Sequence, residues 1–223
     1  MPVTDFKTLP ARAWLALLAV TLAACSATRP QAENTEGLAP VEPAAYRWAW
    51  VRPGADLARY DQVVLAEPEV RFRDHWQRDY NRSQRELIAQ LDDADVAGIR
   101  ARLIVATRQA FEKELTEAGI DLVARPGPGS LLAEVELLDV DIHAPDVLTP
   151  GLREVYVESA GEMTLSLTLR DGASGEVLYR AVERREDPRM AWPQRQTAVE
   201  NYAAALRILG SWGHALAGLL RPA

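Results

Sequence analysis

A chain of 223 residues, 48% hydrophobic and 26% charged, is long enough to bury the core of one domain and too short for several. Its formal net charge of -7 repels phosphate backbones, so nucleic acid is excluded as an expected partner. A single cysteine excludes an internal disulfide, so core packing alone has to hold the fold together.

The first feature is an apolar run that begins at Ala13, after Lys7 and Arg12, and ends in Leu22-Ala23-Ala24-Cys25. The run is too short to span a bilayer, and its flanks are typical of a secretory leader. Leu-Ala-Ala-Cys resembles the lipobox of bacterial lipoproteins, which implies cleavage before Cys25 and acylation of its thiol. The alternative is an ordinary secretory leader or a buried helix, with an incidental cysteine.

The lipobox resemblance also implies a location. Removal of residues 1–24 would leave Cys25 as the first residue, held to the membrane by several acyl chains. Ser26 stands where the sorting pattern of enteric-type bacteria places an inner-membrane retention Asp, so we expect the outer membrane, facing the periplasm. Small and polar residues predict a tether over 25–45. Residues 46–223 are then expected to form a single periplasmic domain.

An aromatic stripe follows the expected tether. Side chains alternate along a strand, so Tyr46, Trp48, Trp50 and Arg52 are expected on one side. We name Trp48 and Trp50 as candidate partner-binding residues, which would stack on cell-wall sugars or contact a protein. The alternative, which we favour, is that the stripe packs the N-terminal arm onto the domain.

The next segments predict a strand over residues 61–72 and a charged loop or frayed helix over 73–93. Asp74, His75 and Asp79 lie in the charged segment, but they lack the spacing of metal ligands. We therefore expect no metal site.

A helix is predicted over residues 95–118, with Asp95 as its cap and Gly119 at its end. The glycine-rich turn at 125–130 lacks both the lysine of a phosphate loop and the Gly-x-Ser-x-Gly frame of a nucleophile elbow. We expect no cofactor and no catalytic serine there.

Residues 132–142 predict a strand with a β-bulge, because the apolar pattern slips by one position after Leu137 and continues through Leu138, Val140 and Ile142. The slip places a row of four carboxylates on the outer side: Glu134, Glu136, Asp139 and Asp141. Glycosidases and calcium sites use such groups. We expect instead a half-solvated strand whose carboxylates pair with Arg170 or Arg180.

A long connection over residues 143–161 is the first choice for a partner-binding loop, with Pro145 and Tyr156 as its candidate contact residues. A hairpin follows, with its turn at residues 171–175. Its inward side chains are expected to be Met163, Leu165, Leu167 and Leu169, and its return strand is expected to run through Val177, Tyr179 and Ala181.

The last element predicted is a second long helix, with Pro193 at its first position. Its apolar residues recur at helical spacing to the end of the chain. His214 within it has no catalytic partner at helical spacing, so we expect an exposed helical residue.

Several short turn motifs, taken in order, resemble one family of bacterial lipoproteins. They are Arg52-Pro53-Gly54-Ala55-Asp56-Leu57 before Tyr60, Pro126 to Gly129, Gly161-Glu162, Arg170-Asp171 and Gly175-Glu176. Over most of the chain beyond the tether, they resemble the lipoproteins grouped as domain of unknown function 3313. The turn at 171–175 departs from the family's Ser/Thr-richer turn. The resemblance implies an outer-membrane or periplasmic lipoprotein and brings no catalytic residues.

The combined expectation is an α+β fold in the order β-α-β-β-β-α, with a mainly antiparallel sheet and two long helices on one face. The expected function is a non-enzymatic binding or scaffold module for an envelope protein or for peptidoglycan. The alternative is a periplasmic hydrolase that uses the acidic strand face.

Overall fold

The computed structural model describes residues 37–42, 44–83, 90–143, 155–157, 161–186, 194–196 and 198–221, all within one compact unit. It contains three helices: α1 (Trp76–Ser83), α2 (Asp93–Glu117) and α3 (Ala198–Leu219). The first strands are β1 (Ala39–Pro40), β2 (Trp48–Val51), β3 (Gln62–Leu65), β4 (Glu69–Phe72) and β5 (Asp121–Leu122). The later strands are β6 (Ser130–Ile142), β7 (Val155–Val157), β8 (Gly161–Asp171), β9 (Val177–Glu186) and β10 (Gln194–Gln196).

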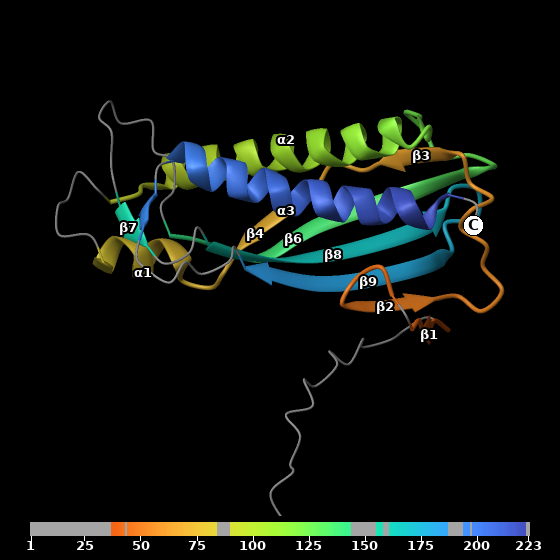
Figure 1. The fold of residues 1–223 in the computed structure, drawn as a ribbon, viewed down its shortest axis with the longest axis horizontal. Coiled ribbons are helices and arrows are strands. Elements are labelled where there is room, and N and C mark those ends of the chain that lie inside the picture. The colour runs from red at the N-terminus through yellow and green to blue at the C-terminus, as the bar shows by residue number, and fades with distance from the viewer. Residues whose placement is uncertain are drawn as a thin grey trace, which may run out of the picture. The chain divides into compact units, whose positions relative to one another are not determined.

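Eight strands form one sheet in the order β1-β2-β9-β8-β6-β3-β5, with β4 also paired to β6. Along this order, neighbouring strands pair in antiparallel fashion from β1 through β2, β9 and β8 to β6. β3 and β4 each pair with β6 in parallel, and β5 pairs with β3 in parallel. Figure 1 shows α2 and α3 over the same side of this sheet. The expected α+β fold with a mostly antiparallel sheet is confirmed. The expected element order is wrong, because it omitted α1 and several short strands.

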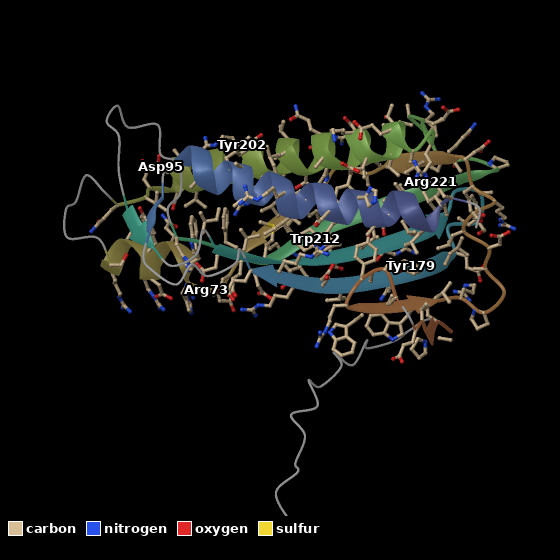
Figure 2. All side chains as sticks on the ribbon, viewed as in Figure 1. Arg73, Asp95, Tyr179, Tyr202, Trp212 and Arg221 are labelled. Atoms are coloured by element: carbon tan, nitrogen blue, oxygen red, sulfur yellow. The ribbon has the colours of Figure 1, made fainter. Side chains whose placement is uncertain are left out.

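The core lies between the helices and the side of the sheet that faces them, called the inner face here. Leu165, Leu167 and Leu169 of β8 are all 0% exposed, as the alternation predicts. Figure 2 shows Tyr179 and Trp212 between α3 and the sheet. The Tyr46 hydroxyl donates to the Trp212 carbonyl at 2.8 Å, and burial raises the pKa of that hydroxyl. Among the described residues, no helix is both long and apolar enough to cross a bilayer.

The helix boundaries differ from those predicted. Asp92, not Asp95, caps α2: its side chain accepts from the Asp95 N–H, and the Asp95 side chain accepts from the Asp92 N–H in return. Gly119 ends the helix as expected, with φ +80°. β10 occupies positions that were predicted as the first turn of the last helix, and α3 is described from Ala198. Pro193 itself lies outside the described residues.

The charged segment after β4 contains α1, which the sequence pattern left open between a loop and a frayed helix. Trp76 is buried at its start and stacks on Phe72 with ring centroids 4.4 Å apart. The Trp76 ring N–H donates to the Ile142 carbonyl at 3.1 Å. The Trp76 contacts, together with the hydrogen bonds between Leu91 and the side chains of Gln77 and Asn81, therefore hold a helix whose other residues are mostly polar.

The N-terminal arm enters the fold earlier than expected. β1 pairs with Trp50 and Val51 of β2, although its residues fell within the predicted tether. The expected alignment of Tyr46 with the tryptophans is wrong, because regular extended structure begins only at Trp48. Tyr46 therefore turns into the main core, and Trp50 packs with Leu38 and Val177.

The predicted bulge in β6 is confirmed. The register with β8 shifts between Leu138 and Asp141, and Asp139 has φ +50°. Val140 returns to the inner face at 0% exposure, as expected. Leu138 does not follow the prediction, because it is half-buried and lies outside the core cluster.

Candidate functional site

The candidate site is the outer face of the sheet, the side opposite α2 and α3 (Figure 1). Two rows of side chains cross its strands in register. The first row joins Trp50, Arg180, Thr168 and Glu134 through directly opposed pairs of β2, β9, β8 and β6. The second row lies two residues away from the first on each of these strands. It joins Trp48, Val182, Ser166 and Glu136 in the same way and adds Glu69 of β4.

The side chains of the two rows differ in length along the rows. Tryptophans stand at the β2 end and glutamates at the β6 end, whereas Ser166 and Thr168 in between have short side chains. The result is a hollow of about 570 Å³, called the outer groove here. Its other main walls come from Glu67 and Glu69, at the break between β3 and β4. The volume falls in the range of small-molecule sites, about 300–1,000 Å³.

Arginines engage three of the four carboxylates in the acidic row. Glu134 pairs with Arg170 at 3.0 Å, which confirms the pairing expected from the sequence. Two further pairs were missed, because they depend on β4 lying parallel to β6. They join Glu136 to Arg71 at 2.6 Å and Asp141 to Arg73 at 2.7 Å. A register of parallel strands so far apart in sequence leaves no local signal.

Trp50 and Trp48 differ in their surroundings. Trp50 is 6% exposed and packs with Leu38 and Val177, so its ring joins the N-terminal arm to the sheet while its edge lines the groove. Trp48 is half-buried, and the Arg47 guanidinium lies 5.3 Å from its ring centroid. Trp50 therefore walls one end of the hollow, whereas Trp48 lies two residues away on the same strand, outside the lining of the hollow.

Of the remaining predicted site residues, Cys25 and Pro145 lie outside the described residues. Tyr156 lies in β7, where its backbone is opposite Arg195 of β10. No cluster of three potential metal ligands occurs among the described side chains.

Two of the family-like motifs meet at the β8–β9 turn. The Tyr60 hydroxyl donates to Asp171 at 2.6 Å, and the backbone N–H groups of Ser174 and Ala173 donate to the same carboxylate at 2.7 and 3.0 Å. These hydrogen bonds, that of Tyr60 first, lower the pKa of Asp171 to about 2. The hydrogen bonds bind the turn to the loop before β3.

The glycine-rich turn before β6 packs against the same end. The Gly172 N–H donates to the Ser130 carbonyl at 2.8 Å. A Cβ at Gly172 would lie 2.3 Å from the Ser130 hydroxyl oxygen, so only glycine fits. Arg52, which follows β2, pairs with Glu176, which precedes β9, at 3.2 Å. The motifs therefore close one end of the sheet, and Arg170 of one motif also lines the outer groove.

Comparisons with known proteins bear on this architecture. The model of the family described as "Protein of unknown function (DUF3313)" matches residues 31–215, which confirms the family resemblance. No curated protein matches the chain.

Three solved structures are similar to this chain at low identity. A PelC dodecamer from Paraburkholderia phytofirmans shares 13% identity at a TM-score of 0.40, covering 76% of this chain and 94% of its own. A DUF330 protein from Xanthomonas campestris shares 14% at 0.38, covering 81% and 91%. A PDZ domain protein from Parabacteroides distasonis shares 11% at 0.36, covering 72% and 33%. At these TM-scores, the likenesses define neither a ligand nor a partner for this chain.

Proposed function

We propose that this chain, which belongs to the DUF3313 family of proteins of unknown function, is a lipoprotein of the outer membrane that faces the periplasm. Cys25 carries the lipid. The domain binds an envelope protein or a cell-wall component on the outer face of its sheet and catalyses no reaction. The observation that carries this proposal is the outer groove, a hollow of ligand size on the side of the sheet opposite the helices.

The length of chain between the anchor and the domain limits where a partner can lie. Leu38 is the first of the described residues that packs against the sheet, and residues 26–37 separate it from Cys25. A stretch of that length spans at most about 40 Å when it is fully extended. The outer groove is walled by Trp50, against which Leu38 packs, so a bound partner lies close to the anchoring membrane.

The alternative of a periplasmic hydrolase rests on the acidic row. A general acid is usually a carboxyl group in an apolar pocket, where the proton is retained. Glu134, Glu136 and Asp141 instead each contact a guanidinium group. This arrangement supports a binding role over a hydrolytic one.

The proposal is tested by crosslinking in cells, with a photoreactive amino acid placed at Thr168 in the groove. Gln109, on the side of α2 away from the sheet and lining a different hollow, serves as the matched control. We expect Thr168 to crosslink to one defined envelope component and Gln109 not to. Equal capture at both positions would contradict a role for the groove. Probes at Pro145 and Tyr156 test the predicted partner loop in the same way.

The anchor is tested separately by Cys25→Ser. We expect the variant to lose incorporated acyl label and to leave the membrane fraction, because no other anchor is proposed. Membrane association and mass identical to the parent protein would overturn the anchor and the localisation.

A further inference from the structure

The charges around the outer groove cancel. Four carboxylates line it, those of Glu67, Glu69, Glu134 and Glu136, together with the guanidinium groups of Arg170 and Arg180. Arg71 and Arg108 approach from outside the lining and pair with Glu136 and Glu67. Four negative groups are thus matched by four positive ones. Because Glu67, Glu134 and Glu136 are each paired, a strongly charged ligand that binds one of them would have to displace its arginine, at the cost of leaving that arginine unpaired.

The floor of the groove offers side chains and not a free strand edge. β8 and β9 are each paired on both sides, β8 with β6 and β9, and β9 with β8 and β2. Their main-chain groups are therefore used within the sheet, and a polypeptide cannot bind here by adding a strand. The ligand has to be recognised by hydroxyl, carboxylate and guanidinium groups.

Those groups supply both kinds of hydrogen bond. Ser166 and Thr168 donate and accept, the glutamates accept, and the arginines donate. Their ion pairs, such as Glu134 with Arg170 at 3.0 Å, hold them in fixed directions before a ligand binds. Trp50 and Val182 add an apolar wall at the opposite end of the rows. The groove thus combines a neutral, hydrogen-bonding surface with an apolar end.

We infer that the outer groove is a saccharide-binding site for an uncharged oligosaccharide of a few rings. Sugar hydroxyls donate and accept together, as the floor and the acidic end require, and the C–H faces of the rings suit the apolar end. The span from Glu134 to Trp50 crosses three strand spacings, about 14 Å, which suits several rings better than one. The inference deepens the proposed function by naming the ligand class of the same groove.

The test uses the full chain in detergent and N,N′,N″-triacetylchitotriose, a neutral oligosaccharide, as the probe, titrated by calorimetry. Thr168→Leu fills the floor of the groove. Thr164→Leu is the matched control, because Thr164 lies on the same strand and face, half-buried, outside the groove lining. We expect saturable binding that Thr168→Leu weakens about tenfold or more and Thr164→Leu changes by less than about twofold. Thermal unfolding of both variants confirms that each is folded.

The salt dependence of the binding affinity distinguishes a neutral ligand from a charged one. Saccharide affinity is expected to change by less than about twofold when the salt concentration is raised from about 0.1 M to 1 M, because no net charge is paired on binding. A trilysine peptide is titrated in parallel. Its salt-sensitive binding in the groove, without binding of the saccharide, would overturn the inference, as would equal effects of the two threonine variants or no saccharide binding.

These results separate a failure of the saccharide inference from a failure of the proposed function. If Thr168 crosslinks to a defined protein in cells and the saccharide does not bind, the binding module is supported and the saccharide site is ruled out. If the saccharide binds and new reducing ends appear, the saccharide site is supported and the non-enzymatic proposal is contradicted.

Discussion

The inner and outer faces of the sheet are built by the same strands and yet are held by different forces. On β8, the inner Leu165, Leu167 and Leu169 are fully buried, while the Ser and Thr residues between them are half-exposed. The inner face is stabilised by burial, at roughly 25 cal/mol per Å² of apolar surface. Outside the small apolar cluster of Leu38, Trp50 and Val177, the outer face carries ion pairs between partly exposed groups, each worth about 0–1 kcal/mol. Most of the stability of the domain is therefore expected from the inner face, which leaves the rest of the outer face free to carry a binding site.

The largest expected effect on stability comes from a substitution on the inner face. Leu167→Ala removes a fully buried side chain from the centre of the core and leaves a cavity beneath the helices. We expect the free energy of unfolding to fall by about 2–5 kcal/mol. Thr168→Ala, the next residue on the outer face, is expected to cost less than about 1 kcal/mol. Urea unfolding of both variants measures the difference, and equal losses would show that the two faces contribute alike.

A smaller effect is expected at the β8–β9 turn, where the Asp171 carboxylate makes stability depend on pH. The Asp171 carboxylate is stabilised in the folded state, with its pKa lowered to about 2. Its contribution is therefore present above the unfolded pKa, near 4, and is lost as the pH falls through about 2. We expect about 1–2 kcal/mol from this group, after allowance for solvent screening.

The control for this acid effect is Asp171→Asn, which removes the titrating group and keeps the size of the side chain. Unfolding free energies measured between pH 5 and pH 2 should fall less steeply for the variant than for the parent protein. Parallel pH profiles would show that Asp171 does not contribute to acid sensitivity.

The smallest expected effect sharpens the description of the outer face. Glu136→Gln removes the charge that pairs with Arg71 at 2.6 Å, where the arginine side chain is 60% exposed. We expect a loss of at most about 0.5 kcal/mol, which disappears at high salt. Thermal unfolding at low and at high salt tests this. A loss of several kcal/mol that salt leaves unchanged would mean that ion pairs, and not the inner core, support the outer strands.

The elements that could be read from the sequence are those whose signal is local. The alternation in β8 identified every inward residue of that strand, and the break in the alternation of β6 located its bulge. The return strand was expected through Val177, but the sequence did not indicate that the register between β8 and β9 shifts near Arg170 and turns Val177 to the outer face, where it packs with Trp50. A bulge in β9 leaves a weaker trace, because apolar residues occur on both sides of it.

The candidate site was only half visible in the sequence. The carboxylates of Glu134 and Glu136 were recognised as an outward row, and Arg170 as a partner. The hollow itself was not, because it arises from Ser166 and Thr168 standing in register between tryptophans of β2 and glutamates of β6. Cross-strand register joins residues more than one hundred positions apart, and no spacing within either strand records it.

The sequence by itself determined which side chains of β8 face the core and where α2 ends, because period and capping depend on neighbours along the chain. It also carried the lipobox resemblance at Cys25 and the turn motifs of the family. Only the tertiary structure decided that β4 lies parallel to β6 and supplies Arg71 and Arg73 to its carboxylates. Strand pairing is set by which distant faces bury the most apolar surface together, and that choice is made by the whole core at once.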